Sequence, residues 1–292
     1  MSRTSVISVS FNSSAVLDRL LCSIPATASI ILVDNGSEDL DATRALAQTH
    51  HAQLVSNQSN AGFGAACNQG ARLSNTEFLF FVNPDSTLGA TTIAQLEAAA
   101  DSHPEASCFN PRIVNRHGTT TFKRRSCLLQ AAQTMRRGAP TQDSEVPVPS
   151  GAALFVRKTA FDQVGGFDDN IFLYHEDDDI TLRLGQQVGA AWFISEAQVM
   201  HQGGHSSGRS GAVAALKAWH MGRSLVYTTT KHRIQSAYRR ALWSALKQLL
   251  SPATIMSKRK FYKNRAFLQG VLSAHDDQGS GHQPYPYAII RP

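Results

Sequence analysis

The sequence predicts an α/β protein with a mostly parallel central sheet flanked by helices, followed by a basic helical extension. Three observations support this fold class. Short runs rich in β-branched and aromatic residues alternate with helical patterns through the first hundred residues, an order typical of βαβ units. Polar side chains follow the expected strands at their carboxyl ends, where open α/β sheets bind their ligands. From about residue 212 the pattern becomes continuously helical and basic.

The expected elements alternate along the chain. Strands are expected at 6–11, 29–33, 53–56 and 77–82, and helices at 14–23, 39–49, 62–73 and 91–102. After a loop at 139–149, we expect a strand at 153–156, helices at 158–164 and 180–188, and a strand at 191–194. This order predicts an α/β domain over residues 1–211, with halves that meet near residue 110, and a helical tail over residues 212–292.

Composition and length describe an ordinary globular protein. The 292 residues are 42% hydrophobic and 17% charged, which excludes a disordered or membrane-embedded chain. The longest apolar runs, such as 78–82, are much shorter than the roughly 20 residues that span a bilayer. The chain enters a strand-like run at Val6 without a basic segment or cleavage site, so a cytoplasmic protein is expected. The four cysteines form no C-x-x-C pair, which favours reduced thiols.

The charge is divided unevenly along the chain. Residues 1–210 contain 15 Lys and Arg against 20 Asp and Glu, whereas residues 211–292 contain 13 against 2. Within the basic part, the pattern over 231–250 is that of an amphipathic helix. Its apolar face comprises Ile234, Tyr238, Leu242, Ala245 and Leu249.

Two partners suit this basic tail. Basic amphipathic helices commonly bind anionic membrane surfaces, which predicts a peripheral protein at the inner face of the cell membrane. The alternative is that the apolar face packs on protein, either within the chain or in a homo-oligomer. No nucleic-acid-binding motif accompanies the charge, so nucleic acid is not an expected partner.

Polar residues at the ends of the first expected strands are candidates for ligand contacts. Asn12 follows the first strand, and Asp34 and Asn35 end the second. Asp34 suits hydrogen bonds from a base or ribose, although an Asp in a strand-to-helix turn commonly caps the next helix. The glycine-rich stretch 60–70 opens a helix but has Cys67 where a dinucleotide-binding fingerprint requires Gly, which argues against a dehydrogenase.

Three further groups supply candidate catalytic and metal-binding side chains. Asp85 follows a fully apolar strand and offers the hard oxygen ligand that Mg²⁺ or Mn²⁺ prefers, with nucleotide phosphates completing the shell. The run from Glu176 to Asp179 offers a general base, and acidic residues also favour a helix N-terminus. His201 offers a nitrogen ligand for Mn²⁺, although a lone histidine is more often structural.

Taken in order, these segments resemble the inverting family 2 glycosyltransferases, in particular the bacterial rhamnosyltransferase-like branch. The likeness covers roughly residues 5–210, and the order of the pieces is more specific than any one piece. The matching pieces are 9–13, 33–37, 60–64 with Asn68 and Gly70, 83–85, 150–157, 164–168, 172–179, and His201 with Ser206.

The resemblance implies a GT-A fold and a role for each matching residue. Asp177 would be the catalytic base, with Glu176 holding the acceptor or the base in place. Asp85 and His201 would bind the metal, and Asn83 stands where many members have the first Asp of a D-x-D element. The donor nucleotide would be lined by Ser10, Asn12, Asp34, Asn35, Asn60, Gly62, Phe63, Asn68, Asn83 and Gly151. Residues 1–110 would form the nucleotide-sugar half and 111–211 the acceptor half.

The resemblance also implies the reaction. A sugar would pass from a nucleoside diphosphate, with inversion, to a hydroxyl of a glycan acceptor carried on a polyprenyl diphosphate, in the synthesis of surface polysaccharide such as O-antigen. L-rhamnose from a dTDP donor is the leading candidate, and a UDP-hexose donor is the alternative within the same fold. A catalytically silent, membrane-associated scaffold remains the alternative from another class. A nucleotidyltransferase is weaker, because the first loop lacks a glycine-rich, basic phosphate cradle.

Overall fold

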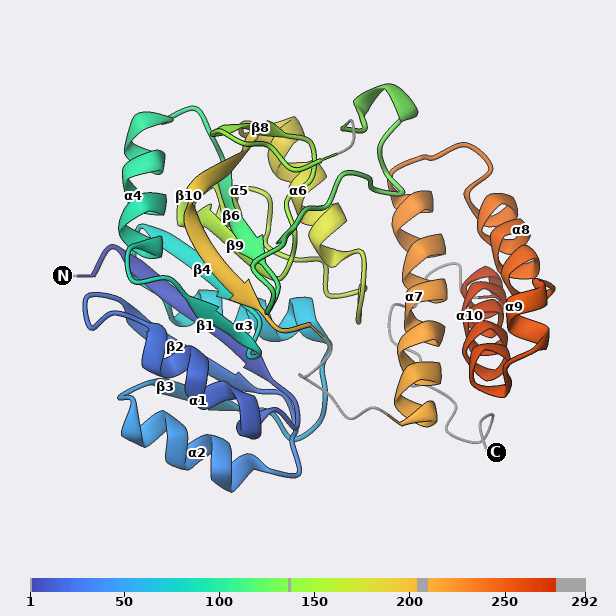
Figure 1. The fold of residues 1–292 in the computed structure, drawn as a ribbon, viewed down its shortest axis with the longest axis horizontal. Coiled ribbons are helices and arrows are strands. Elements are labelled where there is room, and N and C mark those ends of the chain that lie inside the picture. Colours follow the sequence, from blue (N-terminus) through green and yellow to red (C-terminus); the bar gives the residue numbers. More distant parts are fainter. Residues whose placement is uncertain (1, 136–137, 204–209, 277–292) are drawn as a thin grey trace. The chain divides into compact units, whose positions relative to one another are not determined.

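The computed structural model describes residues 2–135, 138–203 and 210–276 and divides the chain into two compact units. The sheet unit consists of residues 1–168 and 177–207, and the helical unit of residues 169–176 and 208–292. Figure 1 shows the strands and helices of each unit. Ser206, which belongs to the resemblance above, lies outside the described residues.

In the described part of the sheet unit, ten strands form one sheet. Their order is β3-β2-β1-β4-β9-β6-β10-β5, with β7 paired to β6 and β8 paired to β10. The strands are β1 (Thr4–Ser10), β2 (Ser29–Asp34), β3 (Gln53–Ser56), β4 (Phe78–Val82), β5 (Ser86–Leu88), β6 (Cys108–Val114), β7 (Thr120–Thr121), β8 (Ser144–Val146), β9 (Ala153–Arg157) and β10 (Ala191–His201).

The α/β fold class is confirmed, and the sheet is mixed rather than mostly parallel. Strands β1 to β4 pair in parallel, whereas β9 runs antiparallel between β4 and β6. Aromatic packing fixes this antiparallel register, because Phe155 of β9 lies opposite Phe80 and stacks on Phe78 with 4.8 Å between ring centroids. Apart from Arg157 at its end, β9 is apolar and buried on both faces, so its sequence does not indicate its direction.

Helices cover both faces of the sheet. Side chains of α1 (Ser14–Ser23), α2 (Leu40–Thr49) and α4 (Thr92–Ser102) enter the hydrophobic core on one face. Those of α3 (Phe63–Leu73), α5 (Lys158–Gln163) and α6 (Glu176–Gln187) enter the core on the other face. A short 3-10 helix spans Ala131–Gln133. This three-layer arrangement aligns the carboxyl ends of β1, β2 and β4 along one edge, where the predicted ligand contacts lie.

The helix that carries the acidic run begins earlier than the sequence pattern predicts. We expected a helix from residue 180, but α6 begins at Glu176. The Asp177 side chain accepts a hydrogen bond from the Asp178 backbone N–H at 2.9 Å, and the Thr181 hydroxyl donates to the Asp177 carbonyl at 2.6 Å. These bonds satisfy backbone groups of the first turn, where acidic side chains also complement the helix dipole.

The helical unit has a core of its own. It contains α7 (Gly211–Lys231), α8 (Ala237–Leu249), α9 (Pro252–Ile255) and α10 (Lys258–Asp276), and α7 packs extensively on α10. Ala241 and Ala245 of α8 are buried in this core, and Tyr238 and Leu242 pack against it. The apolar face predicted over 231–250 therefore packs on protein within the helical unit. Among the described residues, no helix is both long and apolar enough to cross a membrane.

The short segment 169–176 belongs to the helical unit and is held by α7. The Phe172 ring stacks on the His220 ring with 4.2 Å between centroids, and the Ser224 hydroxyl donates to the Leu173 carbonyl at 2.9 Å. Tyr174 and His175 both adopt left-handed backbone conformations, with φ of 68° and 69°, which cost free energy for residues other than glycine. Contacts with α7 thus hold a strained backbone directly before Asp177.

The stability of the protein should fall in mild acid because His220 is buried in its neutral form. Burial, and then the charge of Arg223, lower the pKa of His220 from 6.5 to about 4. The unfolded chain therefore binds more protons than the folded chain between these values, so stability is complete above pH 6.5 and declines as the pH falls towards 4. The total loss is about 3 kcal/mol at 1.36 kcal/mol per pKa unit.

Urea unfolding at pH 7 and pH 5 measures this effect. We expect the wild-type protein to lose about 2 kcal/mol more between these pH values than His220→Gln. The control His117→Gln replaces an exposed histidine and should keep the wild-type pH dependence. Equal losses in wild type and His220→Gln would contradict a neutral, buried His220.

Candidate active site

The first part of the site lies where β1 and β2 end. Ser10 and Asp34 are the last residues of these strands and are directly paired in their parallel register. Both residues are fully buried, yet the Ser10 hydroxyl and one carboxylate oxygen of Asp34, Oδ2, have no hydrogen-bond partner. The other oxygen of Asp34 accepts from the Ser37 backbone N–H at 2.9 Å. Buried polar atoms are almost always paired in folded proteins, so each of these two atoms still has room for a hydrogen bond.

The asparagines around this point hold the loops together. Asn12, in a left-handed conformation, accepts from the Glu38 backbone N–H at 2.8 Å and donates its own N–H to the Ser37 hydroxyl at 2.9 Å. The Asn35 side chain donates to Asn60 Oδ1 at 2.9 Å and to the Gly62 carbonyl at 3.1 Å. The structure therefore brings these predicted residues to one edge of the sheet, where their side chains join neighbouring loops.

The start of α3 lies next to these asparagines, because Gly62 accepts the hydrogen bond from Asn35. Gly62 precedes the helix at φ 93°, a backbone conformation that favours glycine. Phe63 packs edge-on against Phe167 with 6.4 Å between ring centroids. Asn68 is buried, and its side chain bonds both the N–H and the carbonyl of Phe167 at 2.9 and 2.8 Å. Asn68 thus fastens the loop at 164–168 to α3.

The second part of the site is a carboxylate–imidazole pair. Asp85 follows β4 and its side chain is fully buried, while His201 ends β10 and lies opposite Ser86 of β5. The Asp85 Oδ1 and His201 Nε2 atoms lie 3.1 Å apart, and Asn83 Nδ2 lies 3.3 Å from the same imidazole nitrogen. The antiparallel β5–β10 pairing brings together residues 116 positions apart, as the predicted metal site requires.

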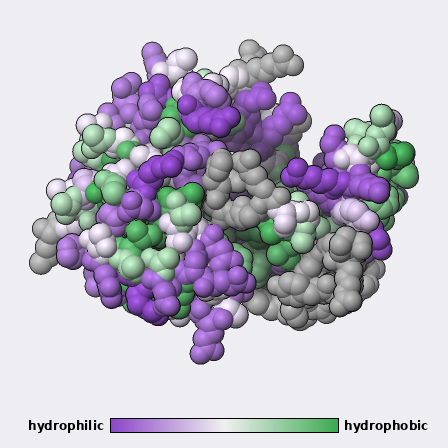
Figure 2. Space-filling model, turned by 60° about the horizontal axis from the view of Figure 1, so that its bottom comes forward, coloured by the Kyte–Doolittle hydropathy of each residue, from purple (hydrophilic) through white to green (hydrophobic). Residues whose placement is uncertain are grey.

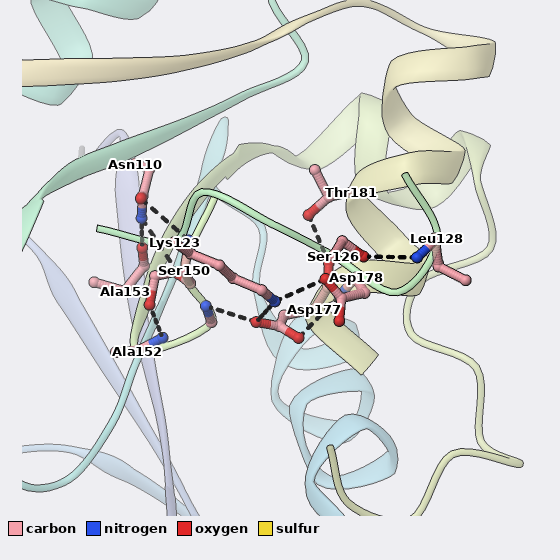
Figure 3. Close-up of polar contacts among 11 residues, drawn as sticks. Asn110, Lys123, Ser126, Leu128, Ser150, Ala152, Ala153, Asp177, Asp178 and Thr181 are labelled. Atoms are coloured by element: carbon pink, nitrogen blue, oxygen red, sulfur yellow. Dashed lines mark hydrogen bonds and ion pairs between the residues drawn. The ribbon is translucent and has the colours of Figure 1, made fainter. Parts of the chain in front are cut away.

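The third part of the site is the Asp177 carboxylate in the first turn of α6. Asp177 Oδ2 accepts from the Gly151 backbone N–H at 3.1 Å (Figure 3). A Cβ atom on Gly151 would lie 2.9 Å from the Asp177 Cβ, so a larger residue cannot occupy position 151 without displacing the carboxylate. Gly151, predicted to contact the nucleotide, contacts the predicted base.

Lys123 is a neighbour of the predicted base that the sequence did not reveal. Its ammonium lies 2.7 Å from Asp177 Oδ2 and 2.8 Å from Asp178 Oδ1, between the two carboxylates (Figure 3). Burial lowers the pKa of Lys123, but the charges of Asp177 and Asp178 outweigh it, so the pKa lies above its usual range. Lys123 is therefore charged at every working pH. It lies in an irregular segment after β7, in a basic triplet with no recognisable motif.

One turn links the surroundings of the Asp85–His201 pair to the Asp177 carboxylate. In the turn 150–153, the Ala152 carbonyl accepts from the Asn83 N–H at 3.0 Å, and the Gly151 N–H binds Asp177. Asn110 of β6 clamps this turn, because its side chain accepts from the Ser150 N–H at 3.1 Å and donates to the Ala153 carbonyl at 2.7 Å (Figure 3). One short turn thus connects the strand end before Asp85 to Asp177.

The neighbours of Asp177 in the acidic run differ in role. Asp179 is fully buried and receives two bonds from Arg183 at 2.9 and 2.6 Å, and Arg183 also donates to the Val164 and Gly166 carbonyls. Asp179 is thus a structural anchor. Glu176 is the first residue of α6 and is half-buried. Burial raises the pKa of Tyr174 above its usual value, and the charge of Glu176 adds to this increase.

The fold is that of the GT-A glycosyltransferases, as two solved structures show. A mannosyltransferase from Pyrobaculum calidifontis, solved with GDP-Man and Mn²⁺, shares the fold with a TM-score of 0.59 at 14% identity, over 95% of this chain and 88% of that one. TarS 1–349 from S. aureus gives a TM-score of 0.55 at 15% identity, over 94% of this chain and 91% of that one.

The chain belongs to glycosyl transferase family 2, whose model matches residues 5–165. It is also similar to the N-acetylglucosaminyl-diphospho-decaprenol L-rhamnosyltransferase of Mycobacterium tuberculosis, strains CDC 1551 and H37Rv. The identity is 29% over 260 residues, which cover 78% of this chain and 84% of the relative. The predicted family, and its rhamnosyltransferase-like branch, are thus confirmed.

Proposed function

We propose that this glycosyltransferase transfers a sugar, with inversion, from a nucleoside diphosphate to a hydroxyl of a lipid-linked glycan. The proposal rests on the turn at 150–153. This turn contacts both Asp177, the candidate base, and Asn83, which lies beside the candidate metal ligand Asp85. L-rhamnose from a dTDP donor is the preferred sugar, because the Mycobacterium tuberculosis relatives are named as rhamnosyltransferases acting on a decaprenol-linked substrate.

Asp177 is the proposed general base. Two of the donors on its carboxylate, Lys123 and the Gly151 N–H, bind Oδ2, whereas Oδ1 accepts from the Asp178 N–H. A carboxylate oxygen has two lone pairs, so Oδ1 is the oxygen with room for the proton of an acceptor hydroxyl. As the proton moves to Oδ1, the hydroxyl oxygen attacks the anomeric carbon from the face opposite the leaving diphosphate. A single displacement of this kind inverts the configuration.

Asp85 and His201 are the proposed ligands of a divalent cation. Their ligand atoms are 3.1 Å apart, close to the roughly 3 Å that separates neighbouring ligands around an ion bound at about 2.1 Å. A carboxylate oxygen with an imidazole nitrogen suits Mn²⁺ and is acceptable to Mg²⁺. When bound, such an ion would neutralise charge on the departing diphosphate. Solved structures of the same fold contain Mn²⁺.

The unpartnered atoms of Ser10 and Asp34 are the proposed contacts for the donor nucleotide. Asp34 Oδ2 is an acceptor, so it suits a base that presents an N–H group, such as the N3–H of thymine or uracil. Asn12, Asn35 and Asn60 shape the loops around this point. A UDP-hexose donor satisfies the same atom and remains the second candidate.

We expect the protein to work as a peripheral protein at the inner face of the cell membrane, in the synthesis of a surface polysaccharide such as O-antigen. A polyprenyl-diphosphate acceptor is confined to the bilayer, so the enzyme has to reach that surface. The basic composition of residues 211–292 supports this location, because anionic lipid attracts clustered Lys and Arg. A homo-oligomer is compatible with the same function.

Calorimetric titration with dTDP, UDP and GDP, each with and without Mn²⁺, tests the proposed donor and metal sites. We expect metal-dependent binding with a preference for dTDP, and a loss of the Mn²⁺ dependence in Asp85→Ala. The control Glu105→Ala removes the acid of an exposed carboxylate–histidine pair and should bind like wild type. Preference for UDP would select the hexose donor. Absence of all nucleotide binding would favour the scaffold.

A further inference from the structure

The helical unit carries a second apolar surface besides the one that forms its core. Trp243, Leu250, Ile255 and Met256, here called the apolar tip, are 62%, 70%, 70% and 88% exposed. They lie on α8, at its C-terminal end, at the end of α9 and directly after it. Trp243 and Leu250 are seven residues apart and so face the same way, two helical turns from each other.

The apolar tip is not the face that packs inside the helical unit. Ala241 and Ala245 of the same helix are buried in the core, with Leu242 packed against it. Single exposed apolar residues are common on protein surfaces, but four large ones fall within fourteen residues here, and such a concentration of exposed apolar side chains typically marks an interaction surface. Figure 2 shows apolar atoms beside hydrophilic ones at the right-hand edge of the view, where Figure 1 places α8 and α9.

The charged residues that neighbour the apolar tip in the sequence are positive. Lys247 lies over the Trp243 ring, 5.2 Å from its centroid. Lys258, Arg259 and Lys260 are exposed and follow Met256 after one residue, Ser257. The sequence contains no Asp or Glu from residue 211 to residue 275, and Asp276 lies at the opposite end of α10 (Lys258–Asp276) from this basic cluster. A partner that fits this surface therefore has an apolar interior and a negatively charged surface.

We propose that the apolar tip inserts into the headgroup region of an anionic lipid bilayer while the surrounding Lys and Arg bind lipid phosphates. The inference rests on the proposed function, since a polyprenyl-linked acceptor requires the enzyme at a membrane. Tryptophan beside basic residues is typical of the membrane–water interface. The residues of the apolar tip differ from the apolar face that the sequence predicted over 231–250. That predicted face packs within the core of the helical unit.

Vesicle sedimentation of the full-length protein tests the proposal. We expect binding to phosphatidylcholine vesicles that contain phosphatidylglycerol and little binding to phosphatidylcholine alone. The double variant Leu250→Ser with Met256→Ser should bind about a hundredfold more weakly, since each buried apolar side chain contributes roughly tenfold. Lys258→Gln with Lys260→Gln should lose about fivefold per charge. All four substitutions are at exposed positions, so the fold is retained.

A matched control and a spectroscopic readout make the result specific. Leu73→Ser with Val188→Ser removes two exposed apolar side chains from the sheet unit and should leave vesicle binding unchanged. Trp243 emission should shift to shorter wavelength with anionic vesicles, and Trp243→Phe should abolish that shift. Equal vesicle binding by wild type and Leu250→Ser/Met256→Ser would overturn the proposal.

The other occupants of this surface give different results. If the apolar tip packs on protein, the wild-type protein should not bind vesicles. Leu250→Ser/Met256→Ser should then change the oligomeric state in light scattering or lower the Tm, and the membrane proposal fails. Measuring nucleotide binding by the same variant distinguishes a failure of the membrane proposal from a failure of the proposed function. Wild-type affinity for the donor nucleotide would leave the transferase proposal standing, because none of the substituted residues belongs to the donor site.

Discussion

Replacing Asp177 by Asn is expected to lower kcat by about 10²–10⁴, the usual contribution of a positioned general base. Asn keeps the size of the side chain and a carbonyl oxygen that can accept from the Gly151 N–H, but it cannot take up the proton of an acceptor hydroxyl. Donor binding should change little, because the Ser10 and Asp34 atoms are unaffected. The measurement is the initial rate of sugar transfer to a polyprenyl-diphosphate-linked acceptor, with the donor Kd obtained by calorimetry.

Asp162→Asn is the matched control for this variant. Asp162 is also an aspartate paired to a lysine, Lys158, at 2.6 Å, but it is exposed on the surface of α5. Its replacement should leave kcat and the donor Kd at wild-type values. Turnover by Asp177→Asn within a few-fold of wild type would sink the assignment of the base, and a parallel loss of donor affinity would place Asp177 at the nucleotide instead.

The sequence predicted the parts of the site that depend on strand order. Asp34 and Asp85 each follow an apolar strand, and the carboxyl ends of parallel strands meet at one edge, so their placement follows from the βαβ pattern. Ser10 and Asp34 prove to be register partners in that pattern. The pairing of Asp85 with His201 was predicted through the family resemblance, and the antiparallel β5–β10 contact is what realises it.

The remaining features depend on contacts between distant segments. Lys123 reaches Asp177 across 54 residues from an irregular segment, and neither periodicity nor spacing signals such a contact. The antiparallel direction of β9 is fixed by aromatic packing on β4, which a uniformly apolar run does not encode. Helical periodicity correctly found an apolar face on α8, but it cannot distinguish a face that packs in a core from a face that meets a membrane.

Replacing Lys123 by Met is expected to cost about 2–3 kcal/mol of stability at neutral pH, because it removes the ammonium group from between two largely buried carboxylates. Asp177 and Asp178 are 20% and 5% exposed in their side chains, so water compensates for little of the lost charge. Lys123→Arg keeps the positive charge and should retain most of the stability. Urea unfolding of both variants, with kcat measured beside the donor Kd, checks these expectations.

The pH dependence of Lys123→Met separates the loss of charge from the loss of packing. Two adjacent carboxylates repel each other, and protonation relieves that repulsion, so the deficit relative to wild type should shrink as the pH falls from 7 to 5. A packing defect would instead cost the same at both pH values. Lys158→Met, which breaks the exposed pair with Asp162, should cost less than about 1 kcal/mol.

If Lys123 positions the base, kcat should fall at least about tenfold in Lys123→Met and recover in part in Lys123→Arg, with the donor Kd unchanged in both. Unchanged kcat in a destabilised Lys123→Met would confine this lysine to a structural role.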